Sequence, residues 1–540
     1  MSDAVLSIKK LTVALPAWSD RKHAVTEVSL DVGKKEILCV VGESGSGKSI
    51  MGKAILGLLP KPHVQATGGR IMFEGRDILT LSDDEIRKLR GGRISMIFQE
   101  PMTALNPLMK VGRQIYEVLE VHTDLSPSAR WERVLQLVND VHLPDPQRII
   151  NSYPHQLSGG QRQRIVIAIA LALEPSLIIA DEPTTALDVT TQAQILHLMK
   201  ELQRAHGTSI LFITHDFGVV AEIADRVVVM RYGEVVEAGS VDEVLRDPKA
   251  QYTKDLVAAV PSLRPRLREC APTSVPLLVI RDLDKTYVGA GGFFGGAARM
   301  VKAVQKVSLE LERQSSLALV GESGSGKSTL ARCIVGLETS DGGDILLDGE
   351  QLRGLTREQM RPFRRDIQMV FQDPFASLNP RQRVGDIIAL GPMIQGASRK
   401  QALDEARELL SLVGLSPESI DRYPHEFSGG QRQRIGIARA LAVKPKLIVA
   451  DEPVSALDVS VQKQVLELLN DLRRKFGLSM LFITHDLRVA ATVCEEIAIM
   501  QHGVIVERGQ TAMIFAAPQH AYTRSLLDAV PGKEWSKTLA

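Results

Sequence analysis

The sequence predicts an α/β protein of two tandem domains, each with a mostly parallel core sheet and an inserted helical subdomain. Three observations predict this fold. A set of motifs occurs twice in the same order, short apolar runs end at those motifs, and the segment between two of the motifs lacks such runs. A chain of 540 residues is also too long for one apolar core, so several domains are expected.

The repeat defines the domain organisation, because five motifs recur almost letter for letter. The pairs are Gly42–Ser49 with Gly321–Ser328, Tyr153–His155 with Tyr423–His425, Ser158–Arg164 with Ser428–Arg434, Ala180–Pro183 with Ala450–Pro453, and Phe212–Asp216 with Phe482–Asp486. We therefore expect domains over residues 1–262 and 276–540. The stretch 263–275 between them is rich in proline and charge, which is typical of an extended linker. Gly289–Gly296 is interpreted as a surface loop.

Three apolar runs in the first copy predict strands of the core sheet. They cover residues 36–41, 176–180 and 209–214, and each ends at a motif. Runs that are apolar on both faces are typical of buried parallel strands, and ligands of such sheets bind at the carboxyl ends of the strands. The less regular segments 100–165 and 373–436 are predicted to be the helical subdomains.

The composition limits the possible functions. The formal net charge is only +1 and the aromatic content is 4%. The chain therefore lacks the basic excess and the stacking side chains that a nucleic-acid partner would favour, and no such partner is expected. The first residues do not resemble a signal peptide, and the longest apolar run, Ile165–Leu173, is far shorter than the roughly 18 residues of a membrane span. Any membrane role is therefore expected to work through partners. The four scattered cysteines indicate reduced thiols.

The motif Gly-x-x-x-x-Gly-Lys-Ser predicts a phosphate-binding loop (P-loop) in each copy. Its glycines let backbone N–H groups surround phosphates, and the helix that follows adds a favourable dipole. Lys48 and Lys327 are expected to reach the β- and γ-phosphates of ATP, and Ser49 and Ser328 to ligate Mg²⁺. The predicted nucleotide contacts are Gly42, Glu43, Ser44, Gly45, Ser46, Gly47, Lys48, Ser49, Ile50, Gly321, Glu322, Ser323, Gly324, Ser325, Gly326, Lys327, Ser328 and Thr329.

Acidic pairs end apolar runs in both copies. Asp181 and Asp451 stand where a carboxylate can bind the Mg²⁺ shell, and the adjacent Glu182 and Glu452 can act as general base on the attacking water. Alone, an Asp-Glu pair before proline would indicate a solvated turn. In register with a P-loop, the catalytic interpretation is favoured.

A third motif begins a helix in each copy and is predicted to contact nucleotide. Its residues are Ser158, Gly159, Gly160 and Gln161, and Ser428, Gly429, Gly430 and Gln431. A serine cap with small residues leaves a helix start open to an anion. Taken alone, a capped helix with glycine for tight packing explains the motif equally well.

Leu-Ser-Gly-Gly-Gln between a P-loop and an Asp-Glu strand resembles the signature of ATP-binding-cassette (ABC) proteins, and the resemblance covers nearly the whole chain. It implies head-to-tail pairing, so that Lys48 shares an ATP with Ser428–Gln431 and Lys327 with Ser158–Gln161. Gln99 and Gln372 resemble the glutamine that senses Mg²⁺ and the attacking water. His215 and His485 resemble the switch histidine, and Asp188 and Asp458 the loop after the Asp-Glu pair. Both halves keep these residues, so two working ATPase sites are predicted.

The adenine contact differs between the copies. Family members stack the base on an aromatic residue near the first strand, which Tyr287 resembles in the second copy. The first copy has Leu15 at the matching position, with Trp18 nearby. Trp18 is a candidate to stack on adenine in place of the missing aromatic residue, and an ordinary packing role explains it at least as well.

The sequence is most similar to the ATP-binding subunits of bacterial peptide importers, the branch that also serves nickel, glutathione and opines. The stretches that carry this resemblance are residues 181–190 and 451–460, and residues 99–107 and 372–380. It implies two integral-membrane permease partners, an extracytoplasmic solute-binding protein acting indirectly, and a peripheral location on the cytoplasmic face of the inner membrane. Some relatives hold an iron–sulfur cluster in a C-terminal extension, but only Cys270 lies near such a segment, so no cluster is predicted.

Two other classes of tandem ABC protein are weighed against the importer. The first is a soluble ATPase that acts on ribosomes. Proteins of that class have a sequence similar to Glu-Pro-Thr-Asn-His-Leu-Asp after the Asp-Glu strand, and a long charged helical linker joins their two halves. Here Thr185-Ala186-Leu187 and Ser455-Ala456-Leu457 stand instead, with a short proline-bearing linker. The second, a DNA-repair protein, would need inserted zinc-binding cysteine clusters.

Overall fold

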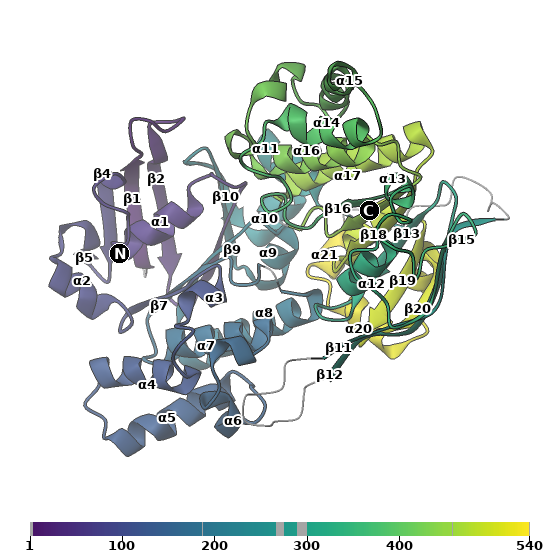
Figure 1. Cartoon of the computed structure of the whole chain (residues 1–540). Helices are drawn as coiled ribbons and strands as arrows, with labels where there is room; N and C mark the ends of the chain where they lie inside the picture. The colour runs from purple at the N-terminus through teal and green to yellow at the C-terminus, as the bar shows by residue number, and fades with distance from the viewer. Residues whose placement is uncertain (1–3, 186, 266–274, 289–299, 456, 539–540) are drawn as a thin grey trace. The chain divides into compact units, whose positions relative to one another are not determined.

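The computed structural model describes residues 4–185, 187–265, 275–288, 300–455 and 457–538 (Figure 1). The chain forms two compact units. The first contains Met1–Val260 together with Pro531–Ala540, and the second contains Pro261–Val530.

The first unit contains ten strands and their connecting helices among the described residues. Its strands are β1 (Ala4–Ala14), β2 (His23–Gly33), β3 (Ile37–Val41), β4 (Gln65–Phe73), β5 (Arg76–Asp77), β6 (Ile94–Ile97), β7 (Leu177–Asp181), β8 (Ser209–Thr214), β9 (Arg226–Arg231) and β10 (Glu234–Ser240). Its α-helices are α1 (Lys48–Ile55), α2 (Asp83–Leu89), α3 (Pro101–Ala104), α4 (Val111–His122), α5 (Pro127–Asp140), α6 (Pro146–Ile150), α7 (Gly159–Leu171), α8 (Val189–His206), α9 (Phe217–Ile223), α10 (Val241–Arg246), α11 (Gln251–Ala259) and α21 (Lys533–Thr538). Short 3-10 helices are η1 (Ile78–Thr80) and η2 (Pro154–Gln156).

The second unit repeats the order of the ten strands, with some differences in the short helices. Its strands are β11 (Pro276–Val288), β12 (Met300–Glu312), β13 (Ser316–Val320), β14 (Gly342–Leu347), β15 (Glu350–Gln351), β16 (Ile367–Val370), β17 (Leu447–Asp451), β18 (Ser479–Thr484), β19 (Glu496–Gln501) and β20 (Val504–Gln510). Its helices are α12 (Lys327–Ile334), α13 (Phe363–Asp366), α14 (Val384–Ile394), α15 (Arg399–Leu412), η3 (Pro417–Asp421), η4 (Pro424–Glu426), α16 (Gly429–Leu441), α17 (Val459–Phe476), α18 (Leu487–Val493), α19 (Thr511–Ala516) and α20 (Ala521–Asp528).

Each unit is built on a six-stranded sheet, in the order β10-β9-β3-β8-β7-β6 in the first. The five strands β9, β3, β8, β7 and β6 are parallel, and only β10 runs antiparallel to its neighbour β9. The second unit has the equivalent order β20-β19-β13-β18-β17-β16. The three predicted apolar runs are β3, β7 and β8, every residue of which is buried. The predicted α/β fold with a mostly parallel core sheet is confirmed.

A second sheet in each unit was not predicted. Strands β2-β1-β4-β5, and β12-β11-β14-β15 in the second unit, form four-stranded antiparallel sheets. In β3, Leu38 and Val40 join the core shared with this antiparallel sheet, while Cys39 and Val41 join the core shared with the helices. Alternate residues of one strand thus pack into two different cores, which explains why the strand is apolar throughout.

The segment after Gln99 is helical, as predicted. Helices α4, α5, α6 and α7 pack against one another, and α7 continues beyond residue 165 into the core of the unit. The second unit has α14, α15 and α16 at the equivalent places. Ser126 and Ser398 cap α5 and α15, where their hydroxyls accept backbone N–H groups that the helix cannot pair.

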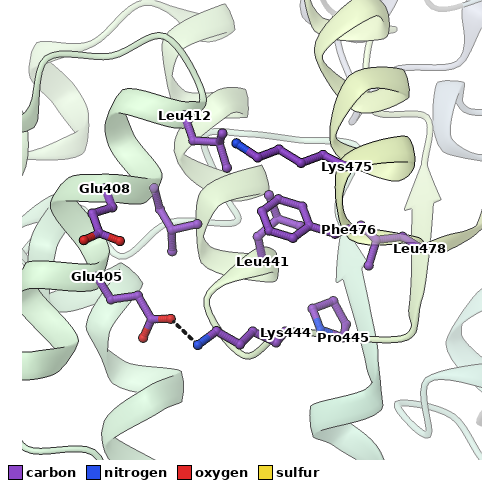
Figure 2. Close-up of a pocket in the computed structure, with 10 residues that line it drawn as sticks. Glu405, Glu408, Leu412, Leu441, Lys444, Pro445, Lys475, Phe476 and Leu478 are labelled. Atoms are coloured by element: carbon purple, nitrogen blue, oxygen red, sulfur yellow. Dashed lines mark ion pairs between the residues drawn. The ribbon is translucent and has the colours of Figure 1, made fainter.

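A cavity of about 530 Å³ opens on the second unit near the ends of α15, α16 and α17 (Figure 2). Leu441, Phe476 and Leu478 line it, and Lys444 pairs with Glu405 at 2.8 Å beside it. In the first unit, Arg133 of α5 pairs with Glu174 at 2.8 Å. The helix α5 therefore supplies the cation of this ion pair, whereas the equivalent helix α15 supplies the anion of the pair in the second unit. None of the predicted site residues lines this cavity.

The C-terminal segment returns to the first unit. Trp535 is buried and belongs to the apolar core that contains α9, which α21 contacts. The chain divides at equivalent places of the repeat, Val260–Pro261 and Val530–Pro531, each within the sequence Ala-Val-Pro.

Candidate functional site

The P-loop joins a buried strand to a helix in each unit. In the first, β3 ends at Val41 and α1 begins at Lys48. Gly47 has φ +100°, and a Cβ atom there would lie 2.3 Å from the carbonyl oxygen of Ala24. Gly326 is equivalent, with φ +106° and 2.0 Å to the carbonyl oxygen of Ala303. Only glycine fits this turn, which brings the loop close to β2 in the first unit and to β12 in the second.

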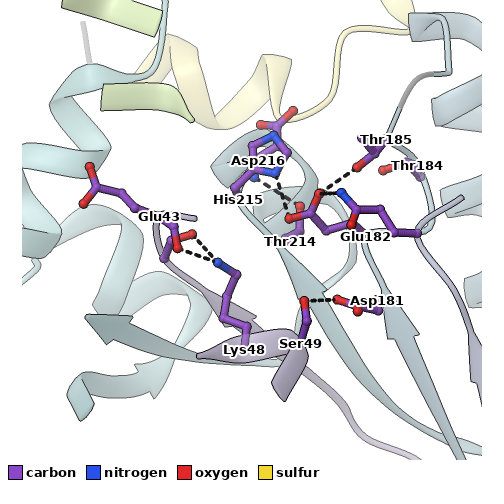
Figure 3. A network of polar contacts seen from close by, with 12 residues as sticks. Glu43, Lys48, Ser49, Asp181, Glu182, Thr184, Thr185, Thr214, His215 and Asp216 are labelled. Atoms are coloured by element: carbon purple, nitrogen blue, oxygen red, sulfur yellow. Dashed lines mark hydrogen bonds and ion pairs between the residues drawn. The ribbon is translucent and has the colours of Figure 1, made fainter. Parts of the chain in front are cut away.

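The P-loop lysine is buried and folded back over its own loop. The Lys48 ammonium group donates to the carbonyl oxygens of Gly42 at 2.6 Å and Glu43 at 2.9 Å, and it also donates to Ser46 Oγ at 3.1 Å. Figure 3 shows the Lys48 side chain turned toward Glu43. Lys327 makes the equivalent bonds at 2.7, 2.7 and 3.4 Å. These bonds satisfy a buried cation and hold it at the mouth of the loop, where phosphates would lie.

A serine hydroxyl and an aspartate carboxylate meet beside each P-loop. Ser49 Oγ donates to Asp181 Oδ1 at 2.8 Å (Figure 3), and Ser328 Oγ donates to Asp451 Oδ1 at 3.0 Å. Burial raises the pKa of both carboxyl groups, although the serine bonds act against it. A nearby cation would offset this destabilisation of the charged form, and Mg²⁺ prefers hard oxygen ligands such as these. The pair of residues therefore fits a magnesium ion.

The glutamate after each aspartate is held from two sides. Glu182 accepts a hydrogen bond from Gln99 Nε2 at 3.0 Å, and its carboxylate lies 3.2 Å from His215 Nδ1. Glu452 accepts one from Gln372 Nε2 at 2.9 Å, with His485 Nδ1 at 3.2 Å. In each unit, the structure thus brings the predicted glutamine and the predicted histidine to the carboxylate of the predicted glutamate.

The charge of this glutamate is set by competing influences. Burial acts to raise the pKa of Glu182, but the hydrogen bond and charge of His215 outweigh it, and the pKa is lowered. The same balance with His485 lowers the pKa of Glu452. Burial acts to lower the pKa of His485, and Glu452 raises it overall. Both glutamates are therefore carboxylates at neutral pH, the form that a general base needs.

The two units differ in one contact to the glutamate. Thr185 Oγ1 donates to the carboxylate of Glu182 at 2.9 Å (Figure 3), whereas Ser455 Oγ donates to the backbone carbonyl oxygen of Glu452 at 3.1 Å. The hydroxyl of Thr185 helps to lower the pKa of Glu182, and no comparable contribution acts on Glu452.

The Ser-Gly-Gly-Gln motif begins α7 and α16. Ser158 and Ser428 cap these helices, and Gln161 and Gln431 complete a reciprocal capping box. The two glycines differ in their surroundings. A Cβ atom on Gly160 would lie 2.5 Å from Thr191, and one on Gly430 would lie 2.3 Å from Val461. Gly159 and Gly429 meet nothing closer than 3.8 Å. The second glycine is thus required by packing, and the first leaves the helix start open.

The residues considered for adenine lie in the described part of the chain. Tyr287 lies next to the last residue of β11 with 36% of its surface exposed, and the Lys285 ammonium lies 5.3 Å from its ring centroid. Leu15 packs against the core, while Trp18 is 75% exposed and contacts the His63 ring edge-on.

Two tyrosines that the sequence did not single out for the site also contact the P-loops. Tyr252 of α11 lies against Glu43, and Tyr522 of α20 against Glu322. The available signal was the dipeptide Tyr-Thr at equivalent places of both copies.

Some sequence-based expectations lie outside the described residues. These are Cys270, which was considered for an iron–sulfur cluster, the glycine-rich stretch 289–296, and Ala186 and Ala456. The other three cysteines are free and buried. Across the described ranges, no helix combines the length and apolar character needed to span a bilayer.

The sequence matches two families. The ABC transporter family matches residues 25–185 and 304–455, and the oligopeptide/dipeptide transporter C-terminal region matches residues 236–282 and 506–539. Both P-loops, both Ser-Gly-Gly-Gln motifs and both Asp-Glu pairs fall in the first family's ranges.

Similar proteins share this tandem arrangement over nearly their full length. The peptidoglycan transport ATP-binding protein YejF of Agrobacterium fabrum is 46% identical, over 99% of this chain and 98% of its own. The glutathione import ATP-binding protein GsiA of Escherichia coli K12 is 45% identical, over 99% and 90%. Among solved structures, a dimeric post-hydrolysis state of the cassette MJ0796 with ADP and phosphate covers 44% of this chain, with 31% identity and a TM-score of 0.40. The predicted resemblance to ATP-binding subunits of the peptide-importer branch is confirmed.

Proposed function

Because this chain belongs to the ABC transporter family, we propose that it is the fused ATP-hydrolysing motor of an importer for peptides or peptide-like solutes. The observation that carries the proposal is the duplication of one complete set of polar contacts. Each unit holds a P-loop lysine, a serine–aspartate pair, and a glutamate bonded by glutamine and paired with histidine. The oligopeptide/dipeptide region occurs in both halves as well.

The proposed chemistry assigns one role to each contact. Lys48 and Lys327 bind the β- and γ-phosphates of ATP, together with the N–H groups of their loops. Glu182 and Glu452 accept the proton of the attacking water, and Gln99 and Gln372 orient that water. His215 and His485 hold the γ-phosphate in line. Ser49 and Asp181, and Ser328 and Asp451, would hold Mg²⁺ together with Gln99 and Gln372, and a bound ion would supply positive charge beside the phosphates.

We propose that two composite sites form from the two domains, taken as residues 1–262 and 276–540. Gly159 and Gly429 leave the starts of α7 and α16 open, which suits the approach of a phosphate. The family resemblance pairs Lys48 with Ser428–Gln431 and Lys327 with Ser158–Gln161. In this account ATP closes the pair of domains, and hydrolysis reopens it. Tyr287 stays the proposed adenine contact of the second site.

The chain needs membrane partners to move a solute. We propose two integral-membrane permease subunits, with an extracytoplasmic binding protein delivering the solute, and a peripheral position on the cytoplasmic face of the bacterial inner membrane. The relatives named for peptidoglycan transport and glutathione import support an importer, and nothing in these matches supports a ribosomal role. Their two cargoes share peptide character.

Uptake by cells tests this proposal. A strain that lacks the chain is complemented either with the wild type or with the Glu182→Gln, Glu452→Gln double variant. We expect the wild type alone to restore uptake of labelled short peptides or of labelled glutathione. Equal uptake in both strains, or uptake of neither probe in either strain, would contradict the assignment to peptide-like solutes.

A further inference from the structure

The region that follows the last core strand contacts the P-loop through a tyrosine in each unit. Tyr252 Oη accepts a hydrogen bond from the backbone N–H of Glu43 at 3.4 Å and donates to the Glu43 carboxylate at 3.2 Å. Tyr522 Oη accepts one from the backbone N–H of Glu322 at 3.1 Å. These contacts join residues 209 and 200 positions apart in the sequence.

In each unit, the helix that carries the tyrosine begins at a loop that a glutamate carboxylate holds in place. Before α11, the carboxylate of Glu237 accepts the backbone N–H groups of Lys249 at 2.6 Å and Ala250 at 3.2 Å. Before α20, Glu507 accepts those of Gln519 at 2.7 Å and His520 at 3.0 Å. Carboxylate bonds to backbone N–H groups are among the stronger hydrogen bonds, so the start of each helix is held in place.

The tyrosine rings are packed rather than solvated. Tyr522 is 8% exposed, and Tyr252 is half-buried with the Arg231 guanidinium 4.5 Å from its ring centroid. Burial, with the nearby charge of Glu43, raises the pKa of Tyr252. The phenol therefore stays protonated at physiological pH and can donate to a carboxylate.

The contact reaches the P-loop lysine through one residue. The carbonyl oxygen of Glu43 accepts the Lys48 ammonium, and that of Glu322 accepts the Lys327 ammonium at 2.7 Å. The tyrosine thus fixes the N–H of the same residue whose carbonyl holds the lysine. The surrounding helix sequences differ, Tyr-Thr-Lys-Asp against Tyr-Thr-Arg-Ser, yet both units form this link.

We infer that Tyr252 and Tyr522 are positioning residues that set the P-loop for ATP and tie it to the oligopeptide/dipeptide C-terminal region. The inference rests on the ATP-binding role of the loops and does not depend on which solute is imported. It gives that region a function at the nucleotide site in both halves of the chain.

The test uses the full chain with Tyr252→Phe, Tyr522→Phe and both together. Phenylalanine keeps the ring and removes only the hydroxyl, so packing is preserved. We expect the KM for ATP of the double variant to rise about two- to tenfold, the effect of losing one net hydrogen bond per site, while kcat stays within about twofold. The matched control is Tyr232→Phe, whose side chain is 70% exposed.

Thermal unfolding of the same proteins separates positioning from general destabilisation. We expect the melting temperature of the double variant to match that of the control. An unchanged KM would overturn the inference, and so would a rise in KM that accompanies an equal fall in kcat and a lower melting temperature. Purified chain without permeases is sufficient, so a failure of the importer assignment would leave this result interpretable.

Discussion

The side-chain amide of Gln99 donates a hydrogen bond of 3.0 Å to the carboxylate of Glu182, 83 residues away in the sequence. Gln99 stands where the core sheet gives way to the helical subdomain, and Glu182 directly follows β7. The second unit repeats the bond between Gln372 and Glu452 at 2.9 Å. A displacement of the helical subdomain can therefore act directly on the carboxylate that we propose as general base.

Replacing either glutamate by glutamine should separate hydrolysis from binding. We expect Glu182→Gln or Glu452→Gln to lower ATP turnover at least about 100-fold, because the substituted amide cannot accept the proton of water. Binding of ATP, measured by equilibrium titration, should be retained. Glu350→Gln, at an exposed position, is the control. Near-normal turnover in either variant would contradict two equivalent working sites.

The threonine contact should affect only the first site. Thr185→Val removes a donor from the Glu182 carboxylate, so the pKa of Glu182 should rise and the acid limb of the turnover–pH profile should move to higher pH. Ser455→Ala is the matched variant, because its hydroxyl bonds the backbone carbonyl of Glu452. We expect that profile to stay in place, and equal displacement in both variants would refute the distinction.

The ion pair of His485 and Glu452 predicts a pH-dependent stability. The pKa of Glu452 is lowered from 4.5, so its contribution is complete above that value and is lost as pH falls through the lowered pKa. The pKa of His485 is raised from 6.5, so its contribution is complete below 6.5 and is lost as pH rises through the raised pKa. Both groups therefore contribute fully to the stability of the folded state between pH 4.5 and pH 6.5.

Thermal unfolding of His485→Gln checks this window. The substitution should lower the melting temperature most at about pH 6, and its effect should shrink as the pH rises through the raised pKa of His485. The exposed His197→Gln is the control, for which we expect no such difference. A loss of stability that is the same at both pH values would show that the pair contributes through packing alone.

The proposed head-to-tail pairing predicts an effect across the domains. Ser428→Arg places a long cation at the start of α16 and should disable the ATP site of Lys48, while the site of Lys327 keeps its ATP. Photolabelling with an azido-ATP, followed by identification of the labelled half of the chain, measures this. Labelling that is lost only from the Lys327 half would contradict the pairing.

The sequence predicted the parts of the fold that local patterns define. β3, β7 and β8 are buried on both faces, so their apolar runs were unambiguous. The antiparallel sheet was missed because β1 is only partly buried and its pairing with β2 is interrupted by register shifts. Such shifts break the alternation by which a half-buried strand is identified.

The residues of the candidate site likewise include some that local sequence patterns predicted and some that they did not. The P-loop, the Asp-Glu pair, Gln99 and His215 lie at strand ends and carried recognisable motifs. Tyr252 was missed because its contact with Glu43 spans 209 residues, and the repeated Tyr-Thr dipeptide alone does not indicate what the tyrosine contacts. The two glycines of the third motif looked alike in sequence, and only the neighbouring Thr191 explains why Gly160 must be small.

Affinity purification of the tagged chain from detergent-solubilised membranes tests the central claim most directly. Mass spectrometry would identify and quantify the proteins that remain bound. The importer account predicts two polytopic membrane proteins in amounts close to that of the chain. Ribosomal proteins in place of polytopic membrane proteins would contradict the transport assignment, while the ATPase chemistry would still stand.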